Sequence, residues 1–149
     1  MYLPIDGAML VLWIHILAAT VWIGGQITLL ALVPLLRAAE GMATAAARRF
    51  QWIAWTAFVI LLVTGVANGY NAHIGWSDLH TTPAGRTLSL KLGFVVLSGI
   101  GAAVHAYYLG PRAGRAPSRR ARAVSGAFAG IGLLAAMVAA LYGVVIAEH

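Results

Sequence analysis

Three side chains that can carry a charge lie inside long apolar stretches of the sequence. They are His15, Lys91 and His105. An ionisable group in such surroundings is costly unless it faces a partner or a ligand, so each is a candidate for chemistry. Imidazole nitrogen binds copper, zinc and haem iron, and an ammonium group pairs with anions. What these groups can do depends on the elements that hold them.

The composition indicates that these elements lie in a membrane. Hydrophobic residues make up 61% of the 149 residues and charged residues only 9%, whereas about 25% of a soluble domain is charged. The net charge of +6 does not indicate nucleic-acid binding, because the arginines cluster in two short segments between apolar runs. That pattern is typical of membrane topology. The absence of cysteine excludes disulfides and thiolate metal sites.

Four apolar runs are long enough to cross a bilayer, which takes ~20 residues in a helix. They cover about 8–36, 50–70, 87–109 and 124–147. Backbone groups in lipid have to be paired within their own segment, so the runs should be helical. Small residues recur along them and favour close helix packing. The sequence therefore predicts an all-α integral membrane protein, an antiparallel four-transmembrane-helix bundle forming a single domain over 1–149.

The basic residues predict the orientation of this bundle. Of the ten Lys and Arg, all but Arg86 and Lys91 lie between the first and second runs or between the third and fourth. The positive-inside rule places both of these segments in the cytoplasm. Both termini and the 71–86 loop then face the periplasm, if the membrane is a bacterial inner membrane. Residues 110–119 read as a flexible loop because they are rich in Pro, Gly, Ser and Arg.

His15 heads one face of the first predicted helix. Ala18, Ala19, Trp22 and Gln26 follow it at helical spacings and share that face. The mixture of polar, small and aromatic residues indicates a face turned into the bundle. His15 would lie ~10 Å below the outer surface. Two interpretations stay open: the alanines leave room for a ligand beside the imidazole, or His15 is a neutral residue bonded to a neighbouring helix.

Lys91, Ser98 and His105 follow one another at intervals of seven residues and share a face of the third helix. Lys91 either extends to the interface or pairs with an anion, and Asn68 is expected at the same depth. His105 lies near the cytoplasmic end, offset from His15 by ~16 Å along the axis. One haem cannot bridge that offset. His105 is thus either part of a second, inner site or a structural residue.

Further possible metal ligands are expected on the outer side. His73 and His80 lie in the predicted outer loop, His149 ends the chain, and Met9 lies near the start of the first helix. Imidazole and thioether groups suit copper. The spacing of the two loop histidines matches no standard zinc pattern, and they could equally be solvated loop residues.

Three stretches carry a resemblance to known families. The segments RRFQWIAWTAFVILLVTGVANG and TTPAGRTLSLKLGFVV resemble the membrane domain of copper resistance protein D (CopD). The shared features are Arg-Phe before a helix, Thr-Gly near its end, and Gly-Arg-x-Leu-x-x-Lys-Leu at the next helix. WIHILAATVWIGG is similar to the first helix of the same group and of the HemJ-type membrane protoporphyrinogen oxidases. The HemJ resemblance implies bound haem b and functional roles for His15 and Lys91.

The CopD resemblance implies copper handling, most simply import. Copper would bind at the periplasmic face to His15, helped by His73, His80 or Met9. It would then pass inward along the stripe from Lys91 to the inner histidine. A periplasmic metal carrier would be the partner.

The HemJ resemblance implies a b-type haem protein as the alternative. His15 would be an axial ligand with His73 as a second, Trp22 would form a pocket wall, and Lys91 or Arg86 would meet the propionates. Such a protein would exchange electrons with quinone or a periplasmic carrier, oxidise a porphyrinogen, or serve as a subunit of a larger complex. An oxidoreductase activity follows only in this case. A structural subunit without a cofactor is the third possibility.

Overall fold

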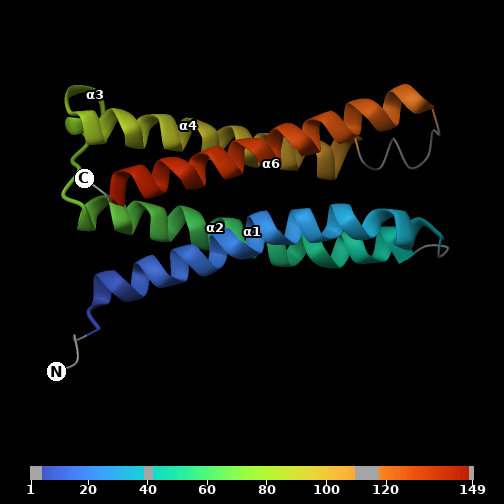
Figure 1. The fold of residues 1–149 in the computed structure, drawn as a ribbon, viewed down its shortest axis with the longest axis horizontal. Helices are drawn as coiled ribbons and strands as arrows, with labels where there is room; N and C mark the ends of the chain where they lie inside the picture. Colours follow the sequence, from blue (N-terminus) through green and yellow to red (C-terminus); the bar gives the residue numbers. More distant parts are fainter. Residues whose placement is uncertain (1–4, 39–41, 110–117, 148–149) are drawn as a thin grey trace. The chain divides into compact units, whose positions relative to one another are not determined.

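In a computed structural model, the chain is described at residues 5–38, 42–109 and 118–147, and all regular structure in these ranges is helical. The long helices are α1 (Gly7–Ala38), α2 (Met42–Asn71), α4 (Pro83–Ala103) and α6 (Arg119–Ala147). A short helix, α3 (Asp78–Thr81), precedes α4, and a π-helix, η1 (Val104–Leu109), continues it (Figure 1). Four helices are long and apolar enough to cross a membrane. The predicted all-α membrane protein with four spans is confirmed.

Three of the four helices begin earlier than the apolar runs indicated. The second was expected from 50 and begins at Met42, and the fourth was expected from 124 and begins at Arg119. Arg48 and Arg49 therefore lie in α2 and not in a loop. Arginine is a good helix former, so the helices continue past the apolar residues. Residues 110–117, and with them most of the predicted flexible loop, lie outside the described residues, as do the side chains of Arg37 and His149.

The early start of α4 has a local cause. The backbone N–H of Gly85 donates to Thr82 Oγ1 at 3.0 Å, which caps the helix, and Pro83 occupies its first position. Both features favour a helix start, because the hydroxyl pairs an orphan N–H and proline needs none. A Cβ atom at Gly85 would collide with the backbone carbonyl of Asp78. Glycine at this position thus allows α3 to pack onto the first turn of α4.

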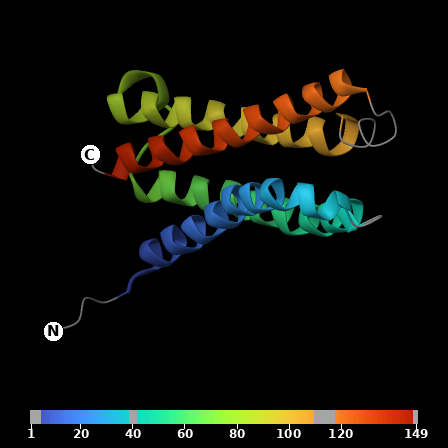
Figure 2. The same cartoon turned by 45° about the vertical axis from the view of Figure 1, so that its right-hand side comes forward.

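The chain divides into two compact units, Met1–Gly75 and Trp76–His149, and each contains one helical hairpin. In the first hairpin α1 packs against α2 (Figure 1 and Figure 2). Gly25 of α1 lies against Phe50 of α2. His15, ~15 Å nearer the start of α1 at ~1.5 Å per residue, bonds to Thr64, which lies further along α2. Partners move forward along α2 as they move back along α1, so the two helices are antiparallel.

In the second hairpin α4 and α6 approach each other through small residues. A Cβ atom at Gly101 would lie 3.0 Å from the Cα of Gly132, so the two backbones are in contact there. Ser98 is only 2% exposed. Small residues permit this close approach of helices in lipid. The expected small-residue packing is therefore present within this hairpin. Assembly of the two hairpins into one four-helix domain over 1–149, and the side of the membrane that each end faces, stay predictions.

Candidate metal-binding residues

His15 is held by a hydroxyl group on the neighbouring helix. Its Nδ1 lies 2.8 Å from Thr64 Oγ1, and the Thr64 hydroxyl donates to the carbonyl of Ile60 at 2.6 Å. A hydroxyl has a single proton to donate, so Nδ1 has to be the donor in the first bond. In the neutral imidazole, Nε2 then carries the lone pair that can bind a metal. A histidine that ligates a metal usually donates its other N–H in this way.

His15 is half-buried toward the end of the first hairpin that contains the start of α1. A Cβ atom at Gly65 would lie 3.4 Å from His15 Cε1, so the ring packs directly over this glycine. Between Arg49 and Thr64 the helix rises ~22 Å, compared with a hydrocarbon thickness of ~30 Å. His15 is thus distant from the arginine end of its hairpin and roughly 8 Å from the opposite surface, if Arg49 marks the lipid boundary.

The face of α1 that His15 heads is turned inward, as predicted. Ala18 and Trp22 are buried, Trp22 being only 3% exposed. The Trp22 ring packs on α2, with its centroid 4.6 Å from that of Phe58 and 5.7 Å from that of Trp55. This aromatic cluster accounts for the position of Trp22 without a ligand. A role of Trp22 as the wall of a haem pocket stays a prediction.

Lys91 lies against α6. A Cβ atom at Gly143 would be 3.0 Å from Lys91 Nζ, so the ammonium group occupies space that the missing side chain leaves. Lys91 is half-buried in this position. Asn68, its expected neighbour, is half-buried on α2, one turn beyond Thr64. The two residues belong to different compact units, and a shared site with both of them stays a prediction.

His105 repeats the arrangement of His15 in the second hairpin. Its Nδ1 lies 2.9 Å from the backbone carbonyl of Ser125 and 3.1 Å from Ser125 Oγ. A carbonyl only accepts, so Nδ1 donates and Nε2 carries the lone pair. His105 lies in the π-helix η1, a geometry that is often found at functional sites. Ser125 follows Arg122 by ~5 Å of helix, so His105 is near the arginine end of its hairpin.

Each histidine can be placed only within its own hairpin, so the predicted separation in depth between His15 and His105 stays a prediction. His15 lies far from the arginines of the first hairpin, whereas His105 lies close to those of the second. The hydroxyl partners on α2 and α6 were not identified from the sequence. The Thr-Gly pair at 64–65 was a visible signal, since a threonine inside an apolar helix needs a partner. Nothing in the sequence indicated the π-helix.

The other candidate ligands are solvent- or lipid-exposed. His73, His80 and Met9 are all exposed. Met9 precedes His15 by six residues, which places it about 120° around α1, at ~100° per residue. His73 and His80 belong to different compact units, so their joint metal site stays a prediction. Within the described ranges, no group of three His, Cys, Asp or Glu is close enough to hold a metal ion.

His73 occupies an unusual backbone position. Its φ angle is 54°, in the left-handed region. The N–H of His73 donates to Tyr70 O at 2.9 Å and that of Ile74 to Gly69 O at 3.2 Å. This is the Schellman pattern that ends a helix, in which glycine usually occupies the place of His73. The sequence places histidine where the backbone favours glycine.

Arg86 lies in the first turn of α4 and is exposed. Its guanidinium donates to the carbonyl of Thr81 at 3.4 Å, a long bond. It also lines a cavity along α4. His15 lines neither this cavity nor a second one beside Arg48. A contact of Arg86 with a haem propionate stays a prediction.

A family model matches this chain over residues 44–147. Its description is copper resistance protein D. The matched region contains Thr64, Lys91 and His105, and begins after α1, so that His15 itself lies outside it. No significant match was found among curated proteins or among solved structures.

Proposed function

From the premise that this chain belongs to the copper resistance protein D family, we propose that it takes up copper at the outer face of a bacterial inner membrane, with His15 as the first ligand. The observation that carries the proposal is the family match over most of the chain. Copper is here the cargo of the protein and not a resident cofactor. Transfer toward the cytoplasm, rather than export, is part of the proposal.

The chemistry of the available donors supports a role for histidine. The chain has no cysteine, so copper would have to bind nitrogen, thioether or oxygen donors. The bond from His15 Nδ1 to Thr64 fixes the ring and leaves Nε2 as the coordinating nitrogen. A ring that is already oriented loses less conformational freedom when it binds a metal. His73, His80 and Met9 are proposed as helpers at the entrance, because their exposure lets them reach an incoming ion.

The charge distribution supports the proposed direction. Arg48 and Arg49 lie in the first two turns of α2, and Arg119, Arg120 and Arg122 open α6. The positive-inside rule places these helix starts in the cytoplasm. His15 would then lie near the periplasmic face and His105 near the cytoplasmic one. Copper would enter at the first histidine and leave near the second.

The test is a copper titration of the purified protein in detergent, with His15→Ala and His105→Ala compared. We expect His15→Ala to remove high-affinity copper binding, because the proposed first ligand is lost. His105→Ala should retain it, since that residue lies near the other surface. Uptake into proteoliposomes should fall in both variants.

A visible spectrum of the same samples decides between copper and haem b. A Soret band that disappears in His15→Ala would show that the site holds haem and would overturn the copper proposal. Equal copper binding in the two variants would overturn the assignment of His15 as first ligand. We propose further that Asn68 and Lys91 contact the ion, and copper titration of Asn68→Ala and Lys91→Ala tests this.

A further inference from the structure

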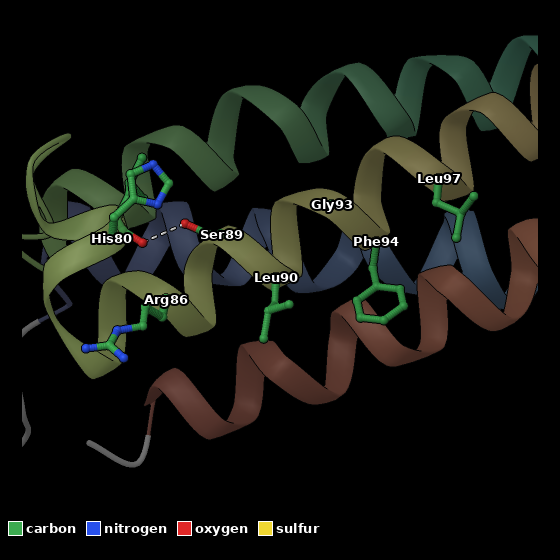
Figure 3. Close-up of a pocket in the computed structure, with 8 residues that line it drawn as sticks. His80, Arg86, Ser89, Leu90, Gly93, Phe94 and Leu97 are labelled. Carbon is green, nitrogen blue, oxygen red and sulfur yellow. Dashed lines mark hydrogen bonds between the residues drawn. The ribbon is translucent and has the colours of Figure 1, made fainter.

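A shallow, largely open groove runs along the outer part of α4, within the second compact unit. Its volume is about 580 Å³. Arg86 and His80 stand at one end, and the rest of the lining is almost entirely apolar, with Leu90, Phe94 and Leu97 along its length (Figure 3). The groove therefore joins a cationic end to an open apolar surface.

The length of the groove matches one leaflet of a bilayer. Arg86, Leu90, Gly93 and Leu97 follow one another at helical spacings and lie on one face of α4. The helix rises ~16 Å from Arg86 to Leu97. Half of the hydrocarbon thickness is ~15 Å. With Arg86 at the interface, the groove ends near the middle of the membrane.

The walls of the groove are held in place by the fold. Phe94 stacks on Tyr142 of α6, with centroids 5.9 Å apart and planes inclined by 16°. The Ser89 hydroxyl donates to the carbonyl of Leu79 at 2.9 Å, which fixes α3 at the outer end. Gly93 creates the floor, because a Cβ atom there would meet nothing within 4 Å. Leu90 is 53% exposed, so the helices of its own unit leave this surface uncovered.

The outer end of the groove is suited to an anion. Among the described residues the Arg86 side chain makes one hydrogen bond, the long one to the Thr81 carbonyl, and the residue is exposed. Arginine offers a planar fork of donors that matches a phosphate group. A positive charge on the predicted outer side also departs from the positive-inside pattern, so a specific anionic partner would explain it.

We propose that this groove binds a phospholipid of the outer leaflet, with its phosphate at Arg86 and one acyl chain lying along Leu90, Gly93 and Leu97. The positive charge of Arg86 favours an anionic head group, and the length of the apolar part of the groove suits an acyl chain. A quinone would match the apolar part but offers no anion to Arg86. The proposal does not depend on copper binding, and the two can fail separately.

The test is native mass spectrometry of the whole protein, purified with phosphatidylglycerol present and released from detergent. Two substitutions alter the two ends of the proposed site. Arg86→Gln removes the charge, and Gly93→Leu fills the floor with a side chain whose Cβ atom meets nothing within 4 Å. Arg120→Gln and Gly126→Leu are matched controls, because Arg120 is also exposed and a Cβ atom at Gly126 also meets nothing within 4 Å.

We expect the native protein and both controls to retain one phospholipid, and both groove variants to retain it about tenfold less. Equal retention by all proteins would mean only non-specific lipid contact and would overturn the proposal. So would loss in Arg86→Gln alone, because the acyl chain would then lie elsewhere. Identification of the retained mass as a quinone, or of a second copy of the chain in place of lipid, would also overturn it.

Discussion

Among the described residues, each hairpin has a histidine that donates Nδ1–H to the neighbouring helix. His15 uses the hydroxyl of Thr64, and His105 uses the carbonyl of Ser125. Each bond satisfies a polar group that would otherwise be costly in an apolar environment. It also determines which nitrogen can bind a metal. At the scale of the residue, the hydrogen-bond partner of each histidine therefore shows which ring nitrogen can bind a metal.

Removal of the Thr64 hydroxyl should weaken copper binding without touching the proposed ligand. In Thr64→Val the His15 ring loses its acceptor, and loss of such a partner typically costs 10–100-fold in metal affinity, so we expect a decrease of about that size. Thr64→Ser keeps the hydroxyl and is the matched control. Competition titration with a copper chelator measures the change. Unaltered affinity in Thr64→Val would contradict a positioning role.

The backbone at His73 predicts an unusual effect on stability. His73→Gly should stabilise the protein by about 1 kcal/mol, because a non-glycine residue in the left-handed region is strained. The control is His80→Gly, which places glycine inside the short helix α3 and should destabilise by about 0.5–1 kcal/mol. Unfolding in mixed detergent micelles gives both values. A loss of stability in His73→Gly would show that the imidazole makes compensating contacts.

At the scale of the elements, the two hairpins are closed by different means. α1 and α2 pack through the rings of Trp22, Trp55 and Phe58. α4 and α6 also have an aromatic contact, between Phe94 and Tyr142, but at Gly101 and Gly132 they pack backbone to backbone. Aromatic packing tolerates small displacements by rotation of a ring, whereas contact between two backbones leaves no such freedom.

The glycine contact should therefore be sensitive to a single methyl group. In Gly101→Ala the new Cβ atom would lie 3.0 Å from Gly132 Cα and 3.1 Å from Phe128 O, and neither backbone atom can move alone. We expect a destabilisation of about 1–3 kcal/mol from overpacking. Gly130→Ala, whose Cβ atom meets nothing within 4 Å, should instead be neutral or stabilising. Equal unfolding midpoints for the two variants would argue against the close contact.

The sequence predicted the elements better than their ends or their partners. Hydropathy identified four spans, because apolar length is a direct requirement of the bilayer. The helical starts at Met42 and Arg119 were missed, since arginine marks the limit of the lipid and not that of the helix. Among the candidate residues, the inward face at His15 followed from periodicity. Its bond to Thr64 depends on how α1 is aligned along α2. The periodicity of a single helix gives no information about that alignment.

At the scale of the whole molecule, orientation can be tested directly because the chain has no cysteine. Single cysteines at Ser77 and Arg119, both exposed, would report the two ends of the second hairpin. We expect a membrane-impermeant maleimide to label Ser77→Cys in intact spheroplasts and Arg119→Cys only after permeabilisation, as the positive-inside rule requires. The reverse pattern would place His15 at the cytoplasmic side and invert the proposed direction.

The contact between α4 and α6 also limits how an ion could travel. Lys91 precedes Gly101 along the chain and His105 follows it, so the two residues lie on opposite sides of the point where these backbones touch. An ion that followed this seam could not diffuse through a standing channel, because Ser98 and its neighbours fill the crossing. The ion would pass the crossing only when α4 and α6 move apart, and each such opening would let one ion pass. Passage by this route would be slow, saturable and free of the steady current that an open pore carries.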